Sequence, residues 1–109
     1  MKFPYLKKEV YKSGSELEER LKQSPGYVSV VLTDNDMNPG KKGIDLIELY
    51  SESVWKNVPM ILYTGRKDLV SESSLEKAFY CLEKPSNLSE ICSVVEKALR
   101  AYDKSNSFE

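Results

Sequence analysis

Three mostly apolar runs divide this chain, and each is followed by polar residues and then by a glycine or a proline. Such runs are typical of strands that are covered on both faces, which are apolar throughout and not only at alternate positions. They predict strands over residues 28–32, 58–63 and 79–82. Residues 9–12 are a fourth, shorter strand candidate.

The segments between these runs are predicted to be helical. Ser15, with Glu18 three residues later, has the spacing of a capping box and predicts the start of a first helix. Gly43 opens a second helix, and residues 66–78 form a third, more polar one. Ser86 is expected to cap the last helix, whose apolar residues recur at helical spacing: Leu88, Ile91, Cys92, Val95 and Leu99.

The expected order of elements is therefore β-α-β-α-β-α-β-α. Strands that alternate with helices are joined by right-handed parallel crossovers, which predicts an α/β fold with helices on both faces of a parallel sheet. The chain has 109 residues, a length that suits one domain. We expect this domain to cover residues 1–101 and a polar tail to cover 102–109.

Charge and composition exclude several classes of function. Sixteen basic and seventeen acidic residues give a net charge of -1, which argues against a nucleic-acid-binding protein. No apolar run is long enough to span a membrane and no leader is visible, so we expect a cytoplasmic protein. The chain has no histidine, which excludes Ser-His-Asp and Cys-His nucleophiles. Cys81 and Cys92 are expected to be buried thiols.

Polar side chains that could do chemistry follow the three main strands. Asp34 follows the first, Thr64 the second and Lys84 the third. Ligands of parallel α/β sheets bind beyond the carboxyl ends of the strands, so these residues are expected to meet at one edge. A carboxylate, a hydroxyl and an ammonium group together make a site for a phosphoryl group.

The segment VVLTDNDMNPGKKGIDLI resembles the phosphoacceptor loop of response-regulator receiver domains. In that family an aspartate at a strand end is followed by a methionine, a Pro-Gly turn and a helix-opening glycine, here Asp34, Met37, residues 39–40 and Gly43. Asn38 is one residue more than the family pattern has. The segments PMILYTG and CLEKPSNLSEI continue the resemblance, which covers roughly residues 9 to 101.

The resemblance implies a flavodoxin-like fold and a role for each matching residue. Asp34 would accept a phosphoryl group, Thr64 would donate a hydrogen bond to it, and Lys84 would place a positive charge against it. Gly65 would leave room beside Thr64. The bond between Lys84 and Pro85 is expected to be cis, because X-Pro bonds tolerate that form at low cost.

The chain also departs from the receiver pattern. It starts at the family's second strand, so about four strands and four helices are expected, without the acidic pair that helps to hold Mg²⁺. Asp34 and Asp36 remain as possible Mg²⁺ ligands. The missing strand would be central, and its loss predicts a homo-oligomer or a strand-supplying partner. Cys81 stands where many receivers have an aromatic switch residue.

Three functions remain open. The first is a phosphorelay receiver, not an enzyme, that takes a phosphoryl group from a sensor histidine kinase or a phosphotransfer protein. The second is a degenerate receiver that binds partners without being phosphorylated. The third is a phosphatase, because Asp34 and Asp36 also form the Asp-x-Asp motif of haloacid-dehalogenase-type enzymes, in which Asp36 would be the general acid.

Overall fold

Four α-helices, one 3-10 helix and three strands form in the part of the chain that the structure, a computed structural model, describes: residues 9–36 and 39–105. Met37 and Asn38, which carry part of the predicted loop motif, lie outside these residues. The elements follow in this order: α1 (Gly14–Leu21), β1 (Val31–Asp34), α2 (Gly43–Tyr50), β2 (Met60–Thr64), η1 (Lys67–Leu69), α3 (Glu72–Leu75), β3 (Tyr80–Glu83) and α4 (Leu88–Ser105).

The strands form one parallel sheet in the order β1-β2-β3, which confirms the predicted α/β fold. Asp34 at the end of β1 is in register with Tyr63, and Thr64 at the end of β2 is in register with Glu83. The carboxyl ends of the strands therefore meet at one edge of the sheet. Lys84 follows Glu83 directly and so begins the loop at that same edge.

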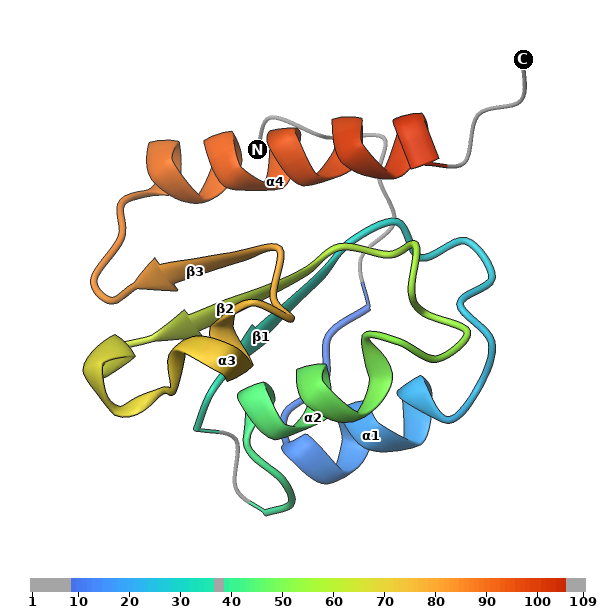
Figure 1. The fold of residues 1–109 in the computed structure, drawn as a ribbon, viewed down its shortest axis with the longest axis horizontal. Helices are drawn as coiled ribbons and strands as arrows, with labels where there is room; N and C mark the ends of the chain where they lie inside the picture. Colours follow the sequence, from blue (N-terminus) through green and yellow to red (C-terminus); the bar gives the residue numbers. More distant parts are fainter. Residues whose placement is uncertain (1–8, 37–38, 106–109) are drawn as a thin grey trace.

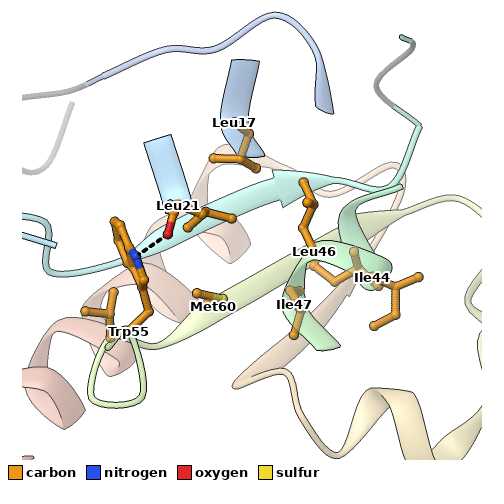
Figure 2. Close-up of a cluster of buried hydrophobic side chains, with 9 residues drawn as sticks. Leu17, Leu21, Ile44, Leu46, Ile47, Trp55 and Met60 are labelled. Atoms are coloured by element: carbon orange, nitrogen blue, oxygen red, sulfur yellow. Dashed lines mark hydrogen bonds between the residues drawn. The ribbon is translucent and has the colours of Figure 1, made fainter. Parts of the chain in front are cut away.

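Helices cover both faces of the sheet, as predicted (Figure 1). Below it, α1 and α2 pack on a core that includes Leu21, Leu46, Ile47 and Met60. Figure 2 shows Trp55 in this cluster, with its indole Nε1 donating a hydrogen bond to the Leu21 carbonyl at 2.9 Å. Above the sheet, α4 buries a second cluster made of Ile61, Leu82, Val94 and Ala98.

The fourth predicted strand is absent, because residues 9–12 are irregular and pair with no strand in the described part of the chain. The predicted cap of the first helix is also wrong by two positions. Ser13, and not Ser15, precedes α1, and its Oγ accepts a hydrogen bond from the Glu16 N–H at 3.1 Å.

The cap of the last helix is Asn87, and not Ser86. The Asn87 Oδ1 accepts from the Glu90 N–H at 2.8 Å, while the Glu90 carboxylate accepts from the Asn87 N–H at 3.0 Å. This reciprocal pair is a capping box. Ser86 instead donates its hydroxyl to the Glu83 carbonyl. The helix then continues to Ser105, past the expected boundary at 101.

The helix expected over residues 66–78 is two short pieces, η1 and α3, neither of which buries a side chain. The Ser71 hydroxyl starts the second piece by accepting from the Ser74 N–H at 3.2 Å. Leu75 of α3 packs only partly against the cluster below the sheet, so a long helix would gain little here from tertiary packing. None of the helices in the described residues is both long and apolar enough to cross a membrane.

The loop that follows Asp34 is held against the start of α1. The Ser15 N–H donates a hydrogen bond to the Pro39 carbonyl at 3.1 Å. Gly40 adopts a φ of 111°, in the region that favours glycine. A side chain on Gly14 would overlap the Lys41 carbonyl, so α1 and this loop approach backbone to backbone.

Candidate functional site

The carboxylate of Asp34 is bound on both oxygens. Its Oδ1 accepts a hydrogen bond from the Asp36 N–H at 3.0 Å, and its Oδ2 accepts one from the Lys84 Nζ at 2.5 Å. Both side chains of this ion pair keep 35% of their surface exposed. The pair is therefore held in place and is still open to an incoming ligand.

These contacts keep Asp34 ionised. Partial burial on its own raises the pKa of Asp34, but the Asp36 N–H and the Lys84 ammonium outweigh it, and the pKa lies below its ordinary value. At neutral pH the side chain is thus a carboxylate, the form in which it can act as a nucleophile.

Lys84 is fixed from three directions. Its backbone N–H donates to the Thr64 carbonyl at 2.9 Å, which ties the start of the loop to the end of β2. Its ammonium reaches Asp34 and also lies 5.2 Å from the centre of the Tyr63 ring. The Lys84-Pro85 peptide bond is cis, as the sequence predicted.

Thr64 ends β2 with only 1% of its surface exposed. Its Oγ1 accepts a hydrogen bond from the Arg66 N–H at 3.1 Å. No hydrogen bond joins it to Asp34 among the described residues. Thr64 lines a hollow of about 550 Å³ together with Asn35, Asp36 and Arg66. The structure therefore brings Asp34 and Lys84 into contact, and places Thr64 at the neighbouring strand end.

The close approach at this site is made at Gly43, and not at Gly65. A side chain on Gly43 would overlap the carbonyl oxygen of Asp34 and lie 3.0 Å from the Thr33 hydroxyl. A methyl group on Gly65 would lie 3.8 Å from the Lys84 Cβ, which is an ordinary contact. The first turn of α2 thus lies in direct backbone contact with the end of β1.

Asn35 is a site residue that the sequence reasoning missed. It is 9% exposed, and its Oδ1 accepts from the Ile44 N–H at 2.9 Å, while its backbone carbonyl accepts from the Gly43 N–H at 3.2 Å. It caps α2 from the preceding strand end. The sequence held one sign of this role. Lys42, the residue before α2, is not a capping residue and makes no side-chain cap, so another residue had to cap the helix.

Both cysteines are free and half-buried. Cys81 packs against the cluster below the sheet, and burial raises the pKa of its thiol. Tyr80, its neighbour on β3, is 48% exposed and faces the other side of the strand. A half-buried thiol thus occupies the position that the family resemblance assigned to an aromatic residue.

The donors for the expected Mg²⁺ ion are few. No group of three Asp, Glu, His or Cys side chains among residues 9–36 and 39–105 is placed to hold a metal ion. Asp34 and Asp36 are two residues apart, and the Asp36 N–H contacts the Asp34 carboxylate. Mg²⁺ often binds through one or two carboxylates together with water and a phosphate. Two carboxylates are too few for a cage made by the protein alone, so any ion here would also need water or a phosphate as ligands.

The sequence matches no protein-family model, and it matches none of the curated proteins with which it was compared. Solved structures do match. A CheY-like receiver domain from Methanospirillum hungatei has a TM-score of 0.76 at 17% identity, over 96% of this chain and 82% of that one.

Two further solved structures also match the fold of this chain. The response regulator TrrA from Thermotoga maritima, solved in complex with Mg(2+)-BeF, has a TM-score of 0.70 at 24% identity, over 84% of this chain and 76% of that one. A protein from Rhodopirellula baltica described as adenylate cyclase has a TM-score of 0.74 at 26% identity, over 89% of this chain and 72% of that one. The chain thus has the CheY-like, flavodoxin-type fold of response-regulator receiver domains, with three parallel strands in its described part.

Proposed function

We propose that this chain is the receiver module of a two-component phosphorelay, and that it accepts a phosphoryl group on Asp34 from a sensor histidine kinase or a phosphotransfer protein. One observation carries the proposal: the contact of 2.5 Å between the Lys84 ammonium and the Asp34 carboxylate at the carboxyl edge of a receiver-type sheet. Such a relay would place the protein in the cytoplasm.

The chemistry follows from the groups at this edge. A carboxylate oxygen of Asp34 attacks phosphorus and forms an O–P bond, which makes an acyl phosphate. The bond between phosphorus and the donor's nitrogen breaks, and its electron pair stays on that nitrogen. Lys84 then neutralises charge that moves from the carboxylate to the phosphoryl oxygens. The chain is an acceptor in this reaction and releases no product from a substrate of its own.

Thr64 would sense the added group. A hydroxyl can accept one hydrogen bond and donate another, and in Thr64 the acceptor side is used by the Arg66 N–H. Its proton is thus available to a phosphoryl oxygen. Because Arg66 directly precedes η1, a movement of Thr64 would reach η1 and α3, the segment that a partner would read.

Mg²⁺, held by Asp34 and Asp36, would supply further neutralisation of phosphoryl charge when it is bound. The complex of TrrA with Mg(2+)-BeF supports this proposal by analogy. Two carboxylates make a weak site on their own, so the ion is expected to bind tightly only when a phosphoryl group or its mimic is present.

We also propose that β1 is completed by a second copy or by a strand-supplying partner. The Val31 N–H donates to the Pro59 carbonyl just before β2, and the Asn35 N–H donates to the Tyr63 carbonyl within it. Alternation therefore turns the N–H and C=O of Leu32 toward the opposite edge, which no other strand of the described residues covers. The Leu32 side chain is 45% exposed. An edge strand whose backbone N–H and C=O groups are unpaired is a template for another strand.

Intact-mass measurement tests phosphorylation. The protein is incubated with phosphoramidate and Mg²⁺, beside the variant Asp34→Asn. We expect one phosphoryl group on the wild type and none on the variant. A wild type that stays unmodified would reject the proposal in favour of the degenerate receiver. Steady hydrolysis of a phosphate ester that depends on Asp36 would instead favour the phosphatase.

Light scattering at micromolar concentration tests the open edge. The variant Leu32→Lys places a charge on this edge and is expected to shift the protein to the monomer. Leu49→Lys is the matched control, because Leu49 is 55% exposed on α2. A folded wild type that is monomeric with and without phosphoramidate, and in the presence of its kinase, would contradict this part of the proposal.

A further inference from the structure

Tyr63 contacts Lys84 and the backbone of the residue that follows Asp34. Its backbone carbonyl accepts a hydrogen bond from the Asn35 N–H at 3.1 Å, one residue after Asp34. Its ring lies 5.2 Å from the Lys84 ammonium, and its hydroxyl accepts from the Ser86 N–H at 3.3 Å. Tyr63 belongs to the central strand and so lies between the two segments that carry the reacting charges.

The ring of Tyr63 is held by packing. It lies against the cluster above the sheet that includes Ile61 and Leu82. The hydroxyl contact with Ser86 fixes the far end of the side chain. The ring therefore presents a constant face to the lysine.

Lys84 needs such a support because its own side chain is flexible. A lysine carries its charge on a four-carbon stem with many rotamers, and 35% of the Lys84 side chain is exposed to solvent. An aromatic face attracts an ammonium group through its quadrupole. The ring thus favours those rotamers in which the ammonium stays near the sheet edge.

We propose that Tyr63 is a positioning residue that holds the Lys84 ammonium against the Asp34 carboxylate for phosphoryl transfer. The part that concerns transfer rests on the function proposed above. The part that concerns the ion pair rests only on the contacts of Tyr63 with Lys84 and Ser86. The two parts need separate measurements.

The ion pair is tested without phosphorylation, by following the side-chain carboxyl carbon of Asp34 by NMR as the pH is lowered. Tyr63→Leu keeps an apolar side chain but removes the ring, and is expected to raise the pKa of Asp34. Tyr63→Phe keeps the ring but loses the hydroxyl contact with Ser86, and is expected to raise the pKa of Asp34 less than Tyr63→Leu does. Tyr80→Leu makes the same change on the neighbouring strand and serves as the matched control.

A cycle with Lys84→Met separates positioning from a general loss of packing. In that background Tyr63→Leu is expected to cause no further rise in the pKa of Asp34, since the cation that the ring holds is gone. A rise of the same size in both backgrounds would overturn the proposal. So would an unchanged pKa in a folded Tyr63→Leu protein.

The wild type provides a test that does not depend on the folding of a variant. Nuclear Overhauser contacts between the Tyr63 ring protons and the ε-methylene of Lys84 are expected, and their absence at neutral pH would overturn the proposal. For transfer, Tyr63→Leu is expected to slow labelling by phosphoramidate about two- to fivefold relative to Tyr63→Phe. Equal rates would overturn the part that concerns transfer. Failure of the wild type to be labelled would reject the proposed function, while the titration of Asp34 still decides the part on the ion pair.

Discussion

The Lys84 Nζ lies 2.5 Å from the Asp34 Oδ2, although the two residues are 50 positions apart in the chain. The parallel order of the sheet is the cause, since β1 and β3 both run toward the edge where these side chains emerge on either side of β2. The sheet thus brings together two charges that are far apart in sequence.

Replacing the lysine is expected to raise the pKa of Asp34. In Lys84→Met the burial of Asp34, which raises its pKa, is opposed only by backbone N–H groups. Loss of one group that stabilises transition-state charge also slows phosphorylation, by about 100-fold. NMR titration and intact-mass kinetics check the two effects, with Lys56→Met as a control. An unshifted pKa would contradict the role of the ion pair.

The same pair makes stability depend on pH. Because the pKa of Asp34 is lowered in the folded state, its contribution to the free energy of unfolding is fully present above the unfolded value. It is lost as the pH falls through the lowered value, below about pH 4. Urea unfolding of wild type and Asp34→Asn is expected to differ at neutral pH and to converge in acid. A constant difference would show that the charge is not involved.

The two glycines at the site are expected to respond differently to alanine. Gly43→Ala drives a methyl group into the Asp34 carbonyl and is expected to lower the free energy of unfolding by about 1–3 kcal/mol. Gly65→Ala makes an ordinary contact and is expected to be tolerated. Urea unfolding measures both. Equal effects would mean that α2 does not press on the strand end as described.

Asn35→Ala removes the cap of α2 and is expected to cost about 1 kcal/mol of stability. Asn35→Asp retains the capping oxygen, so it is expected to keep most of that stability. The added negative charge beside Asp34 is also expected to raise the pKa of Asp34. Urea unfolding and NMR titration of both variants check these effects. If the aspartate were as damaging as the alanine, the cap would not be the function of this side chain.

Thr64→Val keeps the shape of the side chain but leaves the part-buried N–H of Arg66 without its acceptor. The loss of this hydrogen bond is expected to cost about 0.5–1.5 kcal/mol of stability. Thr64→Ser keeps the hydroxyl and is the control, with a smaller loss. Chemical denaturation measures the difference. A valine variant as stable as the serine variant would contradict the assigned hydrogen bond.

The sequence was enough to predict the sheet edge and its polar residues. Continuous apolar runs mark buried strands whatever their neighbours are, and Asp34, Thr64 and Lys84 stand where those runs stop. The start of α2 at Gly43 was also predicted correctly. The likeness of three ordered motifs to one family supported the same fold.

Details that depend on partners in space were not predictable in the same way. The first main strand was expected over residues 28–32 but forms over Val31–Asp34, because pairing with Met60–Thr64 decides where it begins. The contacts of Asn35 and Tyr63 likewise join segments that are distant in sequence. No local pattern marks either residue.

The chain contains a single tryptophan, and Trp55 is almost fully buried. Its indole N–H is shared between the carbonyls of Leu21 and Gln23, and the Arg20 guanidinium lies 5.2 Å from the centre of its ring. Its fluorescence is therefore a natural probe for the docking of the first helix. Emission at this position would follow unfolding of that helix and serve as an internal signal of intact packing in every variant.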